Sequence, residues 1–270
     1  MATLQMNILS YTLGMQANFT VFLPSYVPAK ENAGTDYDTV YPRDVRFKTL
    51  WLLGTEFGDD SELLTNTSIA RFAQKHNIAV VMPCTNNKLY SEDPKGQKFL
   101  RHITEELWTV CHGSLALSDK REDNYIGGVS LGAYAALKAA LRNPEKYSKV
   151  VLLGGAFEEN IADTYFADLN KAIAETGSSI HVGLDDALSD DAEVVSAAES
   201  LKSSGGPLPE ISVSWFENDK FAAYAERAAE NLENMGFSVR TCKYGQEYDD
   251  LWDFADTALK TELNDFICKE

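Results

Sequence analysis

The chain of 270 residues carries 41 acidic and 24 basic residues, so its net charge at pH 7 is −17. This charge argues against nucleic acid and anionic membranes as partners, because both would repel the protein. The hydrophobic content of 44% suffices for a large core, and no linker or repeat divides the chain, so we expect a single domain spanning 1–270.

The N-terminal part of the chain alternates short apolar runs with polar segments. Residues Leu4–Tyr11 and Asn18–Leu23 alternate apolar and polar positions, which predicts an antiparallel hairpin at a sheet edge. Phe47–Leu53 and Ile78–Pro83 are apolar runs, typical of strands that are buried on both faces. The helices expected in this part are Ser68–His76 and Phe99–Cys111, and the loops are Ala29–Asp44 and Cys84–Gln97.

The C-terminal part repeats a pattern of strand followed by helix. Strands are expected at Lys149–Leu153, Ile211–Phe216 and Phe237–Lys243, and helices at Phe221–Met235 and Leu251–Ile267. This alternation predicts right-handed βαβ units and a mostly parallel sheet with helices on both faces. The polar segment 157–206 interrupts the pattern and is expected to form a small helical cap insertion.

The stretch Asn124–Leu141 carries the strongest functional signal. A β-type run leads into Gly128-Val129-Ser130-Leu131-Gly132, and an Ala/Leu-rich helical run follows at once. This is the Gly-x-Ser-x-Gly elbow in its required context of strand, turn and helix. The helix beginning at Leu131 would direct its positive dipole end at the Ser130 oxygen, where an oxyanion could develop. The alternative is a plain strand-to-helix turn that needs two glycines.

The cysteines and the N-terminal residues indicate a compartment. Cys84, Cys111, Cys242 and Cys268 have no paired spacing, so they are interpreted as reduced thiols and not as a disulfide framework or a metal site. The first residues lack the basic and apolar runs of a secretion signal, and no run approaches 18 apolar residues. We therefore expect a cytoplasmic protein without a metal or a cofactor.

From these motifs the chain resembles the esterase D group of α/β-hydrolases, which includes S-formylglutathione hydrolases and tributyrin, acetyl, feruloyl and acetylxylan esterases. The stretch Ser118–Gly132 is the most specific part of the resemblance. The other matching segments are Leu13-Gly14, Leu52-Leu53, Val80-Val81-Met82-Pro83, Tyr90 and Glu105-Glu106-Leu107. The resemblance implies the α/β-hydrolase fold and a serine nucleophile at Ser130.

The resemblance also implies a catalytic acid and base after the nucleophile, in the order Ser, Asp, His. The family's Thr-Glu-Asp pattern corresponds to Glu217-Asn218-Asp219, which assigns the acid to Asp219. The alternative for Asp219 is a cap of the following helix. The family's late motif, Gly-x-His-Asp-Trp-x-x-Trp-Asp, aligns without a gap and puts Glu247 in the histidine column.

No histidine follows His181, so a shifted alignment cannot supply the missing base. His181 itself, in the insertion, is an alternative base. The oxyanion loop departs from the family as well, because Gly54 and Thr55 replace its His-Gly pair. The resemblance then assigns the oxyanion amides to Glu56 and Leu131. We expect Gly54 and Gly58 to keep this loop pliable.

The side chain of Glu56 is expected to turn away from Ser130, because a carboxylate would repel an oxyanion. The resemblance further assigns substrate-binding roles to Tyr90 and Trp252. The ligand implied is a small-molecule ester. The sequence leaves the acyl group and the oligomeric state open, a homo-oligomer included.

Three functions are compatible with these residues. The first is a serine carboxylesterase for short acyl or carbohydrate-linked esters, with altered or impaired activity because the histidine is missing. The second is a catalytically inactive hydrolase-fold protein that binds a ligand or a partner. The third is a Ser-Glu-Asp esterase in which Glu247 and Asp219 share one proton, and such a site would work at acid pH.

Overall fold

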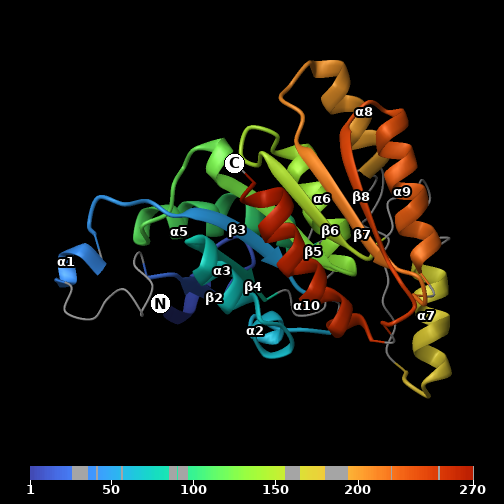
Figure 1. The fold of residues 1–270 in the computed structure, drawn as a ribbon, viewed down its shortest axis with the longest axis horizontal. Helices are drawn as coiled ribbons and strands as arrows, with labels where there is room; N and C mark the ends of the chain where they lie inside the picture. The colour runs from blue at the N-terminus through green and yellow to red at the C-terminus, as the bar shows by residue number, and fades with distance from the viewer. Residues whose placement is uncertain are drawn as a thin grey trace.

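Eight strands form one sheet with the order β1-β2-β4-β3-β5-β6-β7-β8 (Figure 1). The structure, a computed structural model, describes all residues except 26–35, 41, 56, 85–89, 91–96, 156–164, 180–193, 220, 249 and 270. The strands are β1 (Ala2–Ser10), β2 (Met15–Leu23), β3 (Lys48–Leu53), β4 (Ile78–Pro83), β5 (Asn124–Val129), β6 (Lys149–Leu153), β7 (Glu210–Phe216) and β8 (Ser238–Tyr244). β1 and β2 are antiparallel to their neighbours, and the strands from β4 to β8 are parallel.

Helices cover both faces of the sheet, as the alternating pattern predicts. The elements are α1 (Tyr37–Val40), α2 (Glu62–Asn66), α3 (Ile69–His76), α4 (Phe99–Arg101), the π-helix η1 (His102–Leu107), α5 (Trp108–Ser114), the 3₁₀ turn η2 (Arg121–Asp123), α6 (Leu131–Arg142), α7 (Tyr165–Glu175), α8 (Val194–Ser204), α9 (Ala222–Asn234), α10 (Leu251–Glu262) and the π-helix η3 (Leu263–Ile267). One core cluster joins the sheet to α5, α6, α8 and α9, and the other joins it to α3 and α10. In Figure 1, α10 crosses in front of the strands.

Some helices differ from the sequence prediction. α1 lies within the predicted loop Ala29–Asp44, and α2 was not predicted. Both have five residues or fewer, which is too short to generate an apolar periodicity. The predicted helix Phe99–Cys111 is present, but its middle is the π-helix η1.

The predicted cap insertion 157–206 lies partly outside the described residues. At its end, α8 packs on the core: Val194, Ala198 and Leu201 are buried in the same cluster as the helix α6. α8 therefore belongs to the helical layer on that face of the sheet. The cap itself stays a prediction.

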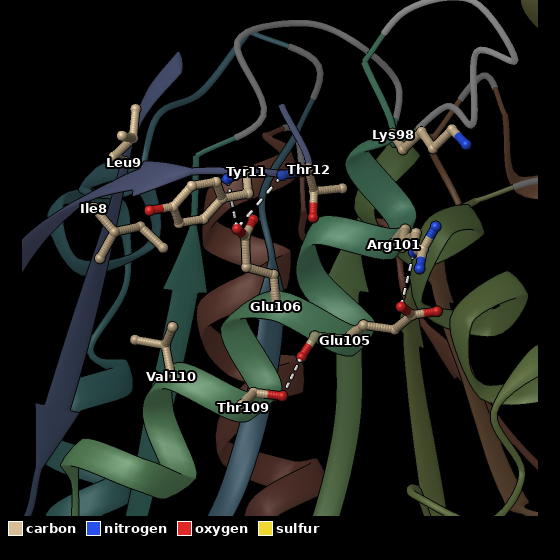
Figure 2. A pocket seen from close by; sticks show the side chains of 10 residues that line it. All are labelled: Ile8, Leu9, Tyr11, Thr12, Lys98, Arg101, Glu105, Glu106, Thr109 and Val110. Carbon is tan, nitrogen blue, oxygen red and sulfur yellow. Dashed lines mark hydrogen bonds and ion pairs between the residues drawn. The ribbon is translucent and has the colours of Figure 1, made fainter. Parts of the chain in front are cut away.

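The turn between β1 and β2 is fastened to η1 by the half-buried carboxylate of Glu106. Oε1 of Glu106 accepts hydrogen bonds from the backbone N–H groups of Tyr11 (2.7 Å) and Thr12 (3.4 Å), as Figure 2 shows. Its Oε2 accepts the hydroxyl of Ser10 and lies 2.7 Å from Nδ1 of His102. Burial raises the pKa of Glu106, but the hydrogen bonds from Ser10, His102 and Tyr11 outweigh it, so this pKa lies below its ordinary value.

The same contacts hold His102, which is fully buried. Burial lowers the pKa of His102, and Glu106 acts in the opposite direction without outweighing it. Because the Glu106 carboxylate can only accept, Nδ1 of His102 is the donor in this contact. Nε2 has no hydrogen-bond partner in the described part of the chain.

Two glycines allow α6 to lie against the ends of β3 and β5. A methyl group on Gly128 would come within 2.2 Å of the carbonyl group of Gly132. A methyl group on Gly132 would come within 2.3 Å of the Leu53 carbonyl oxygen and 2.4 Å of the Gly54 carbonyl oxygen. These neighbours are backbone atoms, which cannot move aside as a flexible side chain can. The start of α6 is therefore held by close backbone contact.

Replacing Gly132 by Ala should lower the free energy of unfolding by about 3 kcal/mol, because the added methyl group forces α6 away from β3. Gly113→Ala is the matched control, since no atom lies within 4 Å of the added methyl group in α5. That variant should gain about 0.5–1 kcal/mol from helix propensity. Urea unfolding measures both, and equal effects of the two variants would contradict this packing.

Replacing Glu106 by Gln should lower the free energy of unfolding by about 2 kcal/mol at pH 7, since hydrogen bonds to a charged acceptor are lost. The pKa of Glu106 is lower in the folded than in the unfolded state. Its contribution is therefore full above the unfolded pKa and disappears as the pH falls through the folded pKa.

Urea unfolding at several pH values should show the difference between wild type and Glu106→Gln shrinking on acidification. Glu105→Gln is the control, because Glu105 is half-exposed and its ion pair with Arg101 contributes little. A difference that stays constant down to pH 3 would contradict the assigned role of Glu106.

Candidate active site

Ser130 lies at the C-terminal end of the central strand β5, in the predicted strand–turn–helix context. Its backbone has φ 54° and ψ −121°, a left-handed conformation that is strained for a residue with a side chain. Its N–H donates to the carbonyl oxygen of Leu153 at the end of β6 (3.0 Å), and its own carbonyl accepts the N–H of Ala133 (2.9 Å). Leu131 is the first residue of α6. The helix N-terminus thus begins directly at the serine.

Asp219 lies in the turn that follows β7. One carboxylate oxygen, Oδ1, accepts the N–H of Phe221 (2.9 Å), so the residue does help to begin α9. The other, Oδ2, lies 3.5 Å from the point that a Cβ on Gly154 would occupy. Gly154 follows Leu153, whose carbonyl holds the Ser130 amide. The carboxylate of Asp219 therefore reaches the end of the strand next to the serine.

Glu247 lies in the turn after β8 and is exposed. Its carboxylate curls back over Gly245, where a Cβ would meet Oε2 at 2.3 Å. The side-chain amide of Asn218 donates to the carbonyl oxygens of Gln246 (2.9 Å) and Tyr248 (3.5 Å). The turn that carries Glu247 is thereby tied to the turn that carries Asp219. Because β5, β7 and β8 are parallel, their C-terminal ends lie on the same side of the sheet. The segments that carry Ser130, Asp219 and Glu247 follow these three strand ends.

Three of the four histidines lie in the described part of the chain, and each has a partner outside the elbow. His76 is 2.8 Å from Oδ1 of Asn264, and His102 is held by Glu106. Nδ1 of His112 is within hydrogen-bond distance of the backbone carbonyl oxygen of Trp108 (2.7 Å), and its Nε2 is within that distance of the carbonyl oxygen of Ser118 (3.0 Å). His181 lies outside the described residues, so its alternative role as a base stays a prediction.

The loop after β3 is organised by Glu62, a residue that sequence reasoning missed. Its carboxylate accepts the backbone N–H of Thr55 (2.9 Å) and the hydroxyl of the same residue (2.6 Å). The carboxylate fills the space beside Gly54 and Gly58, since a Cβ at either position would lie within 3 Å of it. These glycines were expected to make the loop pliable, and that expectation stays a prediction. They make room for the carboxylate that fixes the loop.

The other site residues predicted from the sequence are Glu56, Tyr90 and Trp252. Glu56, the predicted oxyanion residue, lies outside the described residues. Tyr90 is buried at φ 55°, and its hydroxyl donates to the carbonyl oxygen of Gly54 (3.1 Å), so it supports the loop. Trp252 is half-buried in the first turn of α10, where its backbone N–H donates to the side chain of Asp250 (2.7 Å). The substrate-binding roles of Tyr90 and Trp252 stay predictions.

A cavity of about 630 Å³ adjoins this loop on the side of α2, and its lining includes Phe57, Glu62 and Cys84. Phe57 is 49% exposed, and most of the other lining residues are polar. Among the residues that the structure describes, no three His, Cys, Asp or Glu side chains gather closely enough to hold a metal ion. None of the described helices combines the length and the apolar character needed to span a membrane.

Comparisons with known proteins give one consistent family. The model of the family Esterase, described as "Putative esterase", matches residues 10–262. The chain is 25% identical to the acetyl esterase of Caldicellulosiruptor saccharolyticus over 246 residues, which cover 88% of this chain and 89% of that protein. Its fold is similar to the fluorophosphonate-binding serine hydrolase FphF of Staphylococcus aureus, with a TM-score of 0.80 and 26% identity over 100% of this chain and 99% of that chain.

The S-formylglutathione hydrolase FrmB of Staphylococcus aureus has the same fold, with a TM-score of 0.78 and 24% identity over 99% of both chains. The family match covers the strands β2 to β8, the elbow and the turns that carry Asp219 and Glu247. The chain therefore belongs to the Esterase family, and it is a carboxylesterase-type hydrolase with the α/β-hydrolase fold.

Proposed function

We propose that the protein is a serine esterase for short acyl esters, with Ser130 as the nucleophile and with activity that is weak at neutral pH. The observation that carries the proposal is the strained turn at Ser130, held by the Leu153 carbonyl at the N-terminus of α6. Strain of this kind persists where the surrounding structure enforces it, and it exposes a side chain at the top of the sheet. The acetyl esterase relative supports acetyl as the acyl group.

In this proposal the Ser130 oxygen attacks the ester carbonyl carbon, and the carbonyl electrons move onto the oxygen. The Leu131 N–H, at the positive end of α6, stabilises that oxyanion. The alcohol then leaves with a proton, and an acyl group remains on Ser130. Water releases the acyl group as a carboxylic acid in a second attack. Each half of the reaction needs one group that accepts a proton and later returns it.

Glu247 is the proposed proton carrier, in the position that the family gives to histidine. The support is indirect: Asn218 ties the turn of Glu247 to the turn of Asp219. A carboxylate is a weaker base than imidazole toward a serine hydroxyl near neutral pH, and it has no second nitrogen for Asp219 to orient. Ionised Glu247 and Asp219 would also repel each other at close range. Weak neutral turnover follows, with better turnover where the two carboxyls share a proton.

The second candidate is a hydrolase-fold protein that binds a ligand without converting it. Its support is the exposed carboxylate of Glu247, which is turned onto Gly245. A side chain in that position is not arranged as a base. The two candidates differ in whether Ser130 ever carries an acyl group.

Hydrolysis of p-nitrophenyl acetate by the wild type should be weak at pH 7–8 and should increase toward acid pH. Ser130→Ala should remove all enzyme-dependent hydrolysis at every pH, because the nucleophile is lost. Hydrolysis that remains in Ser130→Ala would come from another group and would overturn the assignment of the nucleophile. An inactive wild type at every pH would favour the non-catalytic candidate.

Replacing Glu247 by His should raise kcat/KM at pH 8 by about tenfold or more, because imidazole is the better base there. Glu217→His is the control: it adds a histidine on the neighbouring turn, also from an exposed glutamate, and should change nothing. Robust wild-type turnover at pH 8 that is lost in Ser130→Ala but survives Glu247→Ala would contradict the assignment of Glu247 as the proton carrier. His181 would then be the base to test.

A further inference from the structure

The strand β1 ends the sheet on one side and is regular along its whole length. All nine residues pair with β2 in an unbroken register, from Ala2 opposite Leu23 to Ser10 opposite Met15. Without a bulge, every second residue of β1 points its backbone N–H and C=O away from β2. This outer edge can therefore accept another strand.

The two edges of the sheet differ in how they are protected. β8, at the opposite edge, carries Arg240 and Lys243, and charged side chains of this kind discourage a second strand. β1 carries neither a charged residue nor a proline, although 24% of the whole chain is charged. Among the residues that the structure describes, charged side chains thus protect the β8 edge, and no further strand pairs with the β1 edge.

The two faces of β1 are also suited to burial. Leu4, Met6 and Ile8 pack on the core cluster beneath the sheet but stay half-buried at the edge. The odd-numbered residues point to the opposite face, and Figure 2 shows Ile8 and Leu9 on different sides of the strand. Six large apolar side chains are exposed among the described residues, and three of them are on or beside β1: Met1 (62%), Leu9 (55%) and Tyr11 (88%).

We propose that β1 pairs antiparallel with β1 of a second copy of this chain, which makes one continuous sheet across a dimer. A two-fold axis perpendicular to the sheet brings residues of the same parity together, so partners have residue numbers with an even sum. Full overlap of the nine residues requires a sum of 12. Met6 then faces Met6 of the second copy, and Leu4 faces Ile8 of the second copy. This symmetry keeps the helices of both copies on matching faces.

The same register explains the exposed apolar side chains. It brings Met1 of each copy opposite Tyr11 of the other, and Leu9 opposite Thr3. The pairing also borders a cavity of about 700 Å³ between the end of β1 and the η1–α5 helix, whose lining includes Ile8, Leu9, Tyr11 and Val110. β1 itself is uncharged, so the repulsion between two copies with a net charge of −17 is smallest where they meet through this strand. The register puts apolar side chains opposite apolar ones at Met1, Leu4 and Met6, and this self-complementarity favours a second copy over an unrelated peptide strand.

The register can be tested by charge, because it places Gln5 opposite Asn7 of the second copy, on the exposed face. The double substitution Gln5→Lys/Asn7→Lys would put lysine opposite lysine twice and should weaken self-association about tenfold or more. Gln5→Glu/Asn7→Lys would put glutamate opposite lysine in both pairs and should restore it. Ser238→Lys/Thr241→Lys adds the same charge to exposed positions of β8 and should have no effect.

Light scattering across a dilution series measures the association of all four proteins. The wild type should have twice the chain mass of 29.9 kDa and dissociate on dilution. Circular dichroism and thermal melting establish that each variant is folded, which matters because the Asn7 side chain donates to Asn18. A monomeric wild type at every concentration would overturn the proposal, and so would a dimer that persists in Gln5→Lys/Asn7→Lys or is lost in the β8 control.

Discussion

The close approach of α6 to the end of β3 determines the geometry of the whole site. Gly132 lies so near the carbonyl oxygens of Leu53 and Gly54 that no side chain fits between them. The turn at Ser130 is compressed between this contact and the hydrogen bond to Leu153, which forces its left-handed backbone. The position of Ser130, the N-terminus of α6 and the start of the loop after β3 are therefore set by one packing constraint.

Three carboxylates, those of Glu62, Glu106 and Glu247, bear on the structure and on the proposed chemistry. The loop after β3 is fixed by the carboxylate of Glu62. The turn after β8 carries the exposed carboxylate of Glu247, the proton carrier in the proposed mechanism. A carboxylate can hold a backbone in place by accepting N–H groups, as Glu62 and Glu106 both do. It is less suited to accepting a proton from serine at neutral pH. The same functional group thus holds the backbone at Glu62 and Glu106, and in the proposed mechanism it limits the proton transfer at Glu247.

The sequence predicts the strands and the elbow well, because buried parallel strands are continuous apolar runs. Ile78–Pro83 and Lys149–Leu153 agree with β4 and β6 residue for residue. It does not predict the role of Glu62, because an acidic residue at the start of a short helix resembles an ordinary first-turn residue. The contact of Glu106 with Tyr11 is equally hidden, since it joins residues 95 positions apart in the sequence. Contacts between distant segments depend on the fold, and no local pattern encodes them.

The central claim is that Ser130 forms an acyl-enzyme, and trapping that intermediate tests it most directly. The protein would be mixed with p-nitrophenyl acetate at mildly acid pH, quenched in acid and digested, and its peptides weighed by mass spectrometry. The account predicts one acetyl group on the peptide that contains Ser130, and none on that peptide in Ser130→Ala. An unmodified Ser130 peptide, from a protein that nevertheless releases p-nitrophenol, would contradict it.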